Sequence, residues 1–325
     1  MNQPITHNQP LSLRISVTDK CEFRCLYCMP AEGVRRRNHE DMLSFEQIVD
    51  FVRLARSEFA LAKVHLTGGE PLVRRGIVDL VAMIADLGVN DLALTTNASS
   101  LAPLAGDLKK AGLHRVNVSL DSLDPDVFST LTRGGTLGNV LEGVDAALDN
   151  GLGPIKFNTV VIRGYNHTQV AEMARWAIRR GCVIRFLELM PIGCAKSMFD
   201  DLFVPADEIK EQLARAFELK AQPYSPGAST RYFEASAGDR ADGLVGLISG
   251  QSEPFCSSCR RLRLTCSGKL IACLARGEGP DIRAMLCSNS PADRKMLTKI
   301  LSDELASKAH RGDFDTTHAM AAIGG

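Results

Sequence analysis

The sequence predicts an α/β fold, a partial (β/α)6 TIM-like barrel that is closed by a C-terminal region. From residue 13 to about residue 217, short β-branched runs alternate with helical stretches, which is the rhythm of βα units repeated around a parallel sheet. Six units are too few to close a barrel that normally has eight strands. The rest of the chain must therefore cover the open side.

Each expected strand is a short apolar or β-branched run that a helical stretch follows. The six strands span residues 13–17, 63–67, 91–96, 115–120, 155–162 and 183–190. After the first strand, Ser44 and Gln47 form the capping box of a helix whose apolar face carries Ile48, Phe51 and Val52. Further helices fit residues 76–87, 101–111, 137–150 and 167–180.

This pattern divides the chain into two parts. Residues 1–220 form the partial barrel, and residues 221–325 form the C-terminal region. Residues 222–240 are rich in Pro, Gly, Ser and Asp and are expected to be loops. Residues 289–309 fit one or two helices packed against the barrel.

Composition excludes several classes of partner. With 45% hydrophobic residues, the 325-residue chain can bury a sizeable core. Its 38 basic and 38 acidic residues cancel, so no overall field attracts nucleic acid or an anionic membrane. No apolar run approaches the roughly 20 residues of a membrane helix, and the first ten residues lack the apolar core of a signal peptide. We therefore expect a cytoplasmic protein without nucleic-acid or membrane partners.

Three cysteines lie directly after the first expected strand. Cys21, Cys25 and Cys28 have the spacing CxxxCxxC. A 4Fe-4S cluster normally takes four thiolates, so three would leave one iron open to a ligand that is not protein. The alternatives are a zinc site with a distant fourth ligand, or thiols that are neighbours by chance.

Other distinctive segments also follow strands. Residues 67–71, Thr-Gly-Gly-Glu-Pro, follow the second strand, while residues 95–97 close the third and residues 119–121 the fourth. In parallel α/β barrels the chemistry takes place at the carboxyl ends of the strands. The segments therefore point to a single site at that end of the barrel.

A second group of cysteines lies near the C-terminus. Cys256, Cys259 and Cys273 form a CxxC followed by a third cysteine, and Cys266 lies between them. Taken alone, this spacing is typical of structural zinc. The adjoining segment, residues 260–265, holds three arginines in four residues, and guanidinium groups bind phosphate in planar, bidentate fashion. We favour an anion clamp beside a metal, with a solvated surface as the alternative.

The early cysteine motif resembles the signature of the radical S-adenosylmethionine (SAM) superfamily, because Tyr27 precedes the third cysteine and Met-Pro follows it. The resemblance implies that the first three cysteines hold a 4Fe-4S cluster whose fourth iron binds SAM, which is cleaved to methionine and a 5′-deoxyadenosyl radical. It also implies that Tyr27 lies against the adenine and that Gly69 lies close to the methionine amino group. Ser119 and Met190 match further positions that touch SAM.

The two cysteine groups together, with Arg-x-Arg after the CxxC and Gly324-Gly325 at the end, resemble the GTP 3′,8-cyclases of molybdenum-cofactor biosynthesis. The resemblance covers about residues 11–273. It implies that a second 4Fe-4S cluster binds the guanine of GTP, that the radical removes hydrogen from C3′, and that C3′ then attacks C8. The resemblance also implies that Cys256, Cys259 and Cys273 bind this second cluster.

The same resemblance implies a set of GTP-binding residues and several partners. Arg14, Lys156 and Arg185 would act in catalysis. A reductase or flavodoxin-type protein would supply electrons, cyclic pyranopterin monophosphate synthase would take the product, and the protein would form a homodimer. The implied substrate-binding residues are Arg14, Thr95, Lys156, Arg185, Arg261, Leu262 and Arg263.

Three residues depart from the family pattern. His65 stands where an arginine is usual, Arg260 replaces asparagine or threonine, and Cys266 is an additional thiol. An imidazole cannot form a guanidinium-like fork to phosphate. The alternatives to a GTP cyclase are therefore a divergent paralogue that acts on another nucleotide or a peptide, and a zinc-binding scaffold.

Overall fold

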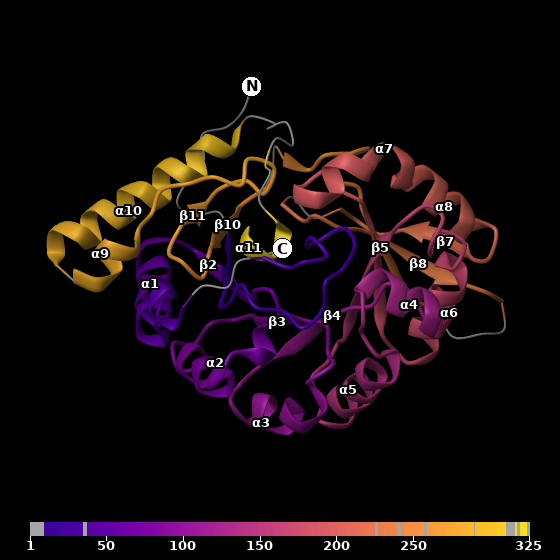
Figure 1. Ribbon diagram of the computed structural model, residues 1–325, viewed down its shortest axis with the longest axis horizontal. Coiled ribbons are helices and arrows are strands. Elements are labelled where there is room, and N and C mark those ends of the chain that lie inside the picture. The colour runs from indigo at the N-terminus through magenta and orange to yellow at the C-terminus, as the bar shows by residue number, and fades with distance from the viewer. Residues whose placement is uncertain are drawn as a thin grey trace.

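The structure is a computed structural model, and it describes residues 10–34, 38–224, 227–238, 242–256, 259–288, 290–309, 316 and 319–323. In this part of the chain the strands form one 11-stranded sheet, in the order β11-β10-β1-β2-β3-β4-β5-β6-β9-β8-β7. The sheet curves into an open arc with helices along its outer side (Figure 1). The partial barrel predicted from the sequence is confirmed.

All six predicted strands are present and parallel to their neighbours. Their bounds lie within two residues of the predicted ones, because each β-branched run is buried on its outer face by the next helix. The strands are β1 (Leu11–Ser16), β2 (Leu61–Thr67), β3 (Leu92–Thr96), β4 (Arg115–Ser119), β5 (Lys156–Val161) and β6 (Val183–Glu188).

The C-terminal part of the chain extends this sheet at both ends. Strand β10 (Arg261–Leu264) pairs in parallel with β1, and β9 (Gly243–Ile248) pairs in parallel with β6. Three antiparallel strands, β11 (Leu270–Ile271), β8 (Arg231–Ser236) and β7 (Glu218–Ala221), complete the edges. The region therefore flanks the six βα units on both sides.

The loops predicted for residues 222–240 were partly wrong, because β8 lies within them. The Pro, Gly and Ser residues mark the connections around an antiparallel hairpin, and the strand itself alternates, with Phe233 and Ala235 buried. Residues 225–226 and 239–241 lie outside the described residues.

Helices cover the convex side of the sheet. Helix α1 (Phe45–Glu58) begins with the predicted capping box, in which Gln47 N donates to Ser44 Oγ and Ser44 N donates to Gln47 Oε1. The predicted C-terminal helix is α10 (Pro291–Ala306), beside α1 in Figure 1. The others are α2 (Ile77–Ala85), α3 (Ala105–Lys110), α4 (Pro125–Thr132), α5 (Leu137–Asp149), α6 (Val170–Arg179), α7 (Phe199–Leu202), α8 (Ala206–Ala214), α9 (Arg283–Ser288) and α11 (Met320–Ile323). Short 3-10 helices are η1 (His39–Asp41), η2 (Pro71–Val73), η3 (Ala102–Leu104), η4 (Gly193–Met198) and η6 (Ser307–Ala309).

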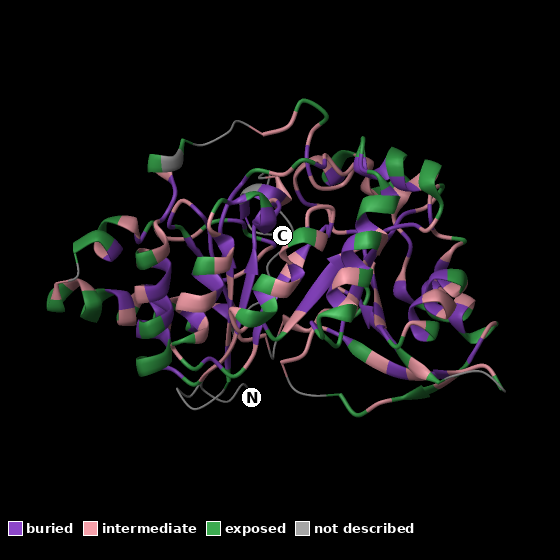
Figure 2. Ribbon diagram, turned by 90° about the horizontal axis from the view of Figure 1, so that it is seen from below, coloured by how far each residue is buried: buried purple, intermediate pink, exposed green. Residues whose placement is uncertain are grey.

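The parallel strands have two different faces. On β1, Leu11, Leu13 and Ile15 are fully buried against the outer helices, whereas Arg14 lies on the opposite, inner face. Buried residues concentrate in the strands and exposed ones on the outer helix faces (Figure 2). Apolar packing thus lies outside the arc, and the polar side chains point into it. None of the helices that the structure describes is long and apolar enough to cross a membrane.

Candidate functional site

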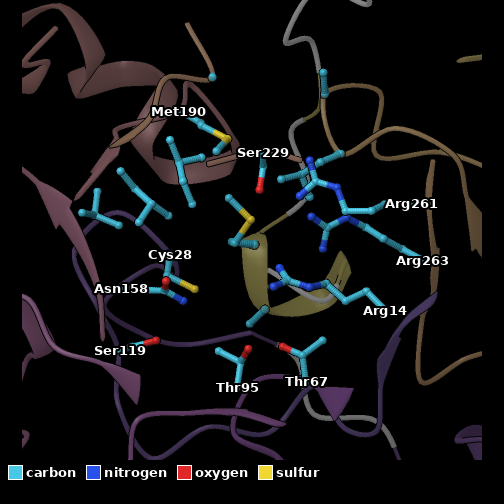
Figure 3. A pocket seen from close by; sticks show the side chains of 18 of the residues that line it. Arg14, Cys28, Thr67, Thr95, Ser119, Asn158, Met190, Ser229, Arg261 and Arg263 are labelled. Atoms are coloured by element: carbon cyan, nitrogen blue, oxygen red, sulfur yellow. The ribbon is translucent and has the colours of Figure 1, made fainter. Parts of the chain in front are cut away.

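A cavity of about 350 Å³ lies inside the arc, at the carboxyl ends of the parallel strands. Side chains from β1, β2, β3, β4, β5, β6, β9 and β10 line its wall. Figure 3 labels residues from β1, β2, β3, β4, β5 and β10. Most of the predicted site residues meet there. They are Arg14, Cys21, Cys25, Tyr27, Cys28, Gly69, Thr95, Ser119, Arg185, Met190, Cys256, Cys259, Arg261, Arg263 and Cys273.

The early cysteines lie on one loop that α4 supports. Arg24 N donates to Thr132 O at 2.9 Å, Leu26 N donates to Leu131 O at 2.8 Å, and Cys28 N donates to Cys25 O at 2.9 Å. Burial raises the pKa of the Cys28 thiol to about 12. Metal binding deprotonates a coordinating thiol, and the three thiols of this loop, which all line the cavity, are the kind of donors that a metal cluster takes.

The Gly-Gly-Glu segment is paired with the backbone that leads into this loop. Gly69 N donates to Thr18 O at 2.7 Å, and Glu70 N donates to Lys20 O at 2.8 Å. A Cβ on Gly69 would lie 2.4 Å from Lys20 O. The packing of the chain itself therefore requires glycine at this position. The sequence suggested a different reason, which is the close approach of a ligand.

Glu70 joins the ends of β2 and β3. Its carboxylate accepts hydrogen bonds from Leu72 N at 2.9 Å, Thr96 Oγ1 at 2.8 Å and Asn97 N at 2.7 Å. Glu70 is 1% exposed, and burial outweighs these three donors and raises its pKa to about 7. The unfolded chain has no such burial.

The raised pKa of Glu70 predicts that stability falls as pH rises from about 5 to 8. The folded state holds the Glu70 proton up to a higher pH than the unfolded state does, so it binds more protons in this window. Glu70→Gln should remove this contribution, reducing the loss of stability between pH 5 and 8 by roughly 1–3 kcal/mol. Anaerobic thermal unfolding of both proteins at the two pH values measures it. An identical loss in both would contradict the prediction.

Tyr27 is fixed at the wall of the cavity by Asp121. Its hydroxyl donates to Asp121 Oδ2 at 2.7 Å, and Val160 N donates to Asp121 Oδ1 at 2.9 Å. Burial raises the pKa of Asp121 to about 6, although both hydrogen bonds oppose the rise. Strands β4 and β5 thereby set the orientation of the ring.

Four arginines form an arginine cluster at this cavity, defined as Arg14, Arg185, Arg261 and Arg263. Figure 3 shows Arg14, Arg261 and Arg263 pointing into the cavity toward Ser119 and Asn158 on the opposite wall. Arg14 and Arg263 are register partners on β1 and β10.

The arginines of this cluster repel one another. Burial, followed by repulsion from Arg263, Arg261 and Arg185, holds the pKa of Arg14 well below its usual range. Burial and Arg261 lower the pKa of Arg263 to about 10. Arg261 lies over the ring of Phe255, with 4.8 Å between the guanidinium carbon and the ring centroid. Such a wall fits a ligand with several negative charges.

The late cysteines meet the same cavity beside the cluster. Burial would raise the pKa of the Cys259 thiol, but Arg261 and Lys308 outweigh it and lower the pKa to about 7. Lys308 is 8% exposed, and its Nζ donates to Cys259 Sγ at 3.5 Å. Cationic surroundings favour the thiolate, so this trio also fits a metal cluster. Cys266 is buried and does not line the cavity.

Neither trio gathers around one point. Among the described residues, no three His, Cys, Asp or Glu side chains lie close enough together to hold a single metal ion. In a 4Fe-4S cluster each thiolate binds a different iron, so its thiolates are more widely spread than the ligands of a single ion.

Two predicted residues do not line the cavity. Leu262 alternates with Arg261 and Arg263 on β10, and its side chain is fully buried in the hydrophobic core, so only its backbone could meet a ligand. Lys156 is the first residue of β5 and so lies at the end of the strand away from the cavity. Its Nζ is 3.5 Å from the Tyr232 hydroxyl.

His65, the departure noted on β2, is a buried neutral imidazole. Asn117 Nδ2 lies 2.7 Å from its Nε2, and Arg115 fixes that amide by donating to Asn117 Oδ1. Burial and the surrounding cations hold the pKa of His65 well below its usual range. Thr95 Oγ1 also lies 2.7 Å from Nε2, so His65 reaches the cavity through Thr95.

The structure adds wall residues that the sequence did not suggest. Asn158 follows Lys156 by two positions, so strand alternation alone could have placed it on the inner face; its Oδ1 is buried with no partner among the described residues. Met320 N, on α11, donates to Cys28 O at 3.2 Å. No local pattern predicted this contact. Gly324 and Gly325, also noted in the sequence, lie outside the described residues.

Comparison with known proteins decides the family. A model described as the Radical SAM superfamily matches residues 15–177, and one described as Molybdenum Cofactor Synthesis C matches residues 182–314. The GTP 3′,8-cyclase of Pelotomaculum thermopropionicum is 43% identical over 302 residues, which cover 92% of this chain and 91% of that protein. The chain belongs to the GTP 3′,8-cyclase family. The enzyme of Geobacter sulfurreducens is 44% identical, over 86% of this chain and 85% of its own length.

A similar fold is found among solved structures. Streptococcus suis SuiB bound to S-adenosylmethionine is similar with a TM-score of 0.59 at 15% identity, over 92% of this chain and 67% of that chain. At this identity the likeness concerns the fold alone.

Proposed function

We propose that this chain converts GTP to (8S)-3′,8-cyclo-7,8-dihydroguanosine 5′-triphosphate, the first step of molybdenum-cofactor biosynthesis. Its cofactors are SAM and two 4Fe-4S clusters, as in its family. The observation that carries the proposal is that both cysteine trios and the arginine cluster line one cavity. A polyanionic nucleotide held there would lie between the two metal sites.

The first cluster and SAM are assigned to one side of this cavity. We propose that Cys21, Cys25 and Cys28 bind the cluster, which with SAM supplies the 5′-deoxyadenosyl radical. Tyr27 and Gly69 lie next to this loop and would hold the adenine and the methionine end of SAM. Ser119 and Met190, also on the wall, complete the proposed SAM site.

The second cluster and GTP are assigned to the opposite side. We propose Cys256, Cys259 and Cys273 as the ligands of the second cluster, which receives the guanine. The arginine cluster would neutralise the triphosphate, with Thr95 below it. Lys156 and the backbone of Leu262 remain proposed contacts of the substrate.

Removing one cation from the arginine cluster should change the stability of the protein and its affinity for GTP in opposite directions. Arg14→Met is expected to stabilise the nucleotide-free protein by on the order of 1 kcal/mol, because a partly buried charge that three other arginines repel is lost. The same change should weaken GTP binding about tenfold or more, because a charge-assisted contact is lost. Thermal unfolding without nucleotide and equilibrium dialysis with GTP measure the two effects. A less stable variant that binds GTP normally would contradict both expectations.

The function is tested with anaerobically reconstituted protein, SAM, GTP and dithionite. Mass spectrometry should find 5′-deoxyadenosine and cyclised GTP in equal amounts. Deoxyadenosine without cyclised GTP would indicate that the substrate is another nucleotide or a peptide. His65 and Arg260 would then be the residues to replace with those usual in the family. The absence of both products would overturn the radical mechanism.

We also propose the partners and organisation that family membership implies. A reductase or flavodoxin-type protein would donate electrons, and cyclic pyranopterin monophosphate synthase would take the product. The chain would act in the cytoplasm, as a homodimer. Residues 1–220 would form the SAM-binding part and residues 221–325 the part with the second cluster; β9 and β10 join the two in one sheet.

A further inference from the structure

A tyrosine of the C-terminal part lies between two of the proposed substrate cations. Tyr232, on β8, has its hydroxyl 3.5 Å from Lys156 Nζ, and the ammonium lies 5.5 Å from the centroid of its ring. Arg185 lies close enough to this phenol for its charge to lower the phenol's pKa. The phenol thus lies beside cations from both β5 and β6.

The sheet brings Tyr232 and Arg185 together across a glycine. Gly246 on β9 is the register partner of Arg185 on one side and of Tyr232 on the other. A Cβ on Gly246 would lie 3.1 Å from both Arg185 Cγ and Tyr232 Cε1, and 2.5 Å from Thr230 Cγ2. The ring and the arginine stem therefore close over the space that a side chain would occupy.

The electrostatics of this cluster favour a fixed arrangement. Burial lowers the pKa of Lys156, and Arg115 and Arg185 lower it further, whereas Tyr232 opposes the change. Burial would raise the pKa of the Tyr232 phenol, but Arg185 and Lys156 outweigh it and lower the pKa. The phenol oxygen therefore offsets the repulsion between two cations that share a half-buried site.

Arg185 is the member of this cluster that meets the cavity. Its side chain lines the cavity, and its Nε is buried with no partner among the described residues. A guanidinium that is already oriented loses less conformational entropy when an anion binds. The phenol can thus contribute to GTP binding without touching GTP.

We propose that Tyr232 is a positioning residue for the nucleotide: its phenol oxygen holds Arg185 and Lys156 in the orientation that receives GTP. The inference rests on the proposed function, and it assigns the β8 hairpin a role in that site. Neither Tyr232 nor Lys156 lines the cavity, so the effect of the phenol on the cavity passes through Arg185.

Tyr232→Phe is the sharpest test, because it keeps the ring over Gly246 and the contact with the Lys156 ammonium and removes only the hydroxyl. KM for GTP should rise about tenfold, while kcat changes much less, since the lost hydroxyl contacts the Lys156 ammonium and lies beside Arg185, and both cations are proposed to bind substrate. GTP-independent formation of 5′-deoxyadenosine in the same samples normalises for active protein. Tyr224→Phe is the control, because that exposed tyrosine also loses a hydrogen bond, to Ala228 O at 2.6 Å, away from the cavity.

A second variant tests the contact between Arg185 and Tyr232 by changing the glycine beside it. Gly246→Ala should push Arg185 and Tyr232 apart and raise KM for GTP in the same way, with thermal unfolding measured alongside to confirm a folded barrel. An unchanged KM in Tyr232→Phe, or a fall confined to kcat, would overturn the inference while wild-type turnover of GTP still stood. If the wild-type protein does not cyclise GTP, the proposed function fails instead, and the inference with it.

Discussion

Cys25→Ser should reduce SAM cleavage to background and leave the barrel folded. Cys25 lies at the cavity between Cys21 and Cys28, and a serine hydroxyl is a poor iron ligand compared with a thiolate. The loop should survive, because the hydrogen bonds that hold it, including Cys28 N to Cys25 O and Leu26 N to Leu131 O, involve backbone atoms that serine keeps.

The readouts for Cys25→Ser are 5′-deoxyadenosine, iron content and circular dichroism, all under anaerobic conditions. Cys287→Ser is the matched control, since Cys287 is an exposed thiol on α9 outside both trios. It should retain cleavage and both clusters. Continued cleavage by Cys25→Ser would remove the first trio from the proposed mechanism.

Cys273→Ser should separate the two halves of the reaction. The second trio comes from a different segment of the chain, so its loss should leave the first cysteine loop and GTP-independent SAM cleavage in place. Cyclised GTP should fall to background, because the proposed contact with guanine is lost. Iron should fall from about eight to about four atoms per chain.

The pattern of products decides between outcomes for Cys273→Ser. Deoxyadenosine without cyclised GTP is the expected result. Continued cyclisation would show that this trio does not hold the substrate, and loss of both products would show that the two sites depend on each other. Cys287→Ser again controls for the loss of a thiol.

Local sequence was sufficient for the six βα units. Each strand is a short β-branched run and each helix has an apolar face, and these periodicities depend only on neighbours in the chain. The capping box at Ser44 is local in the same sense. Strands β9 and β10 were missed, because they are stabilised by partners far away in sequence: β10 by β1, and β9 by β6. Strand β8 was missed because it lies among residues rich in Pro, Gly and Ser.

The candidate site divides in a similar way. Cysteine spacing and the Gly-Gly-Glu segment were sufficient to propose the metal and SAM positions, because close ligands on a short loop need close residues in sequence. Tyr232 gave no such signal, since its meeting with Arg185 depends on the register of three strands and on Gly246 between them. The outward direction of Leu262 follows from strand alternation once β10 is known.

The sequence by itself determined the family, the six repeating units and the identity of the six cysteines, because motif spacing and hydrophobic period are properties of contiguous residues. Only the tertiary structure decided that both trios and four arginines face one cavity, that Gly69 is required by Lys20 O, and that His65 is neutral. Those results depend on distances and burial between segments far apart in sequence, such as Arg14 and Arg263, which are 249 positions apart. The charges that repel one another there are scattered along a chain with no net charge, and the fold alone brings them together.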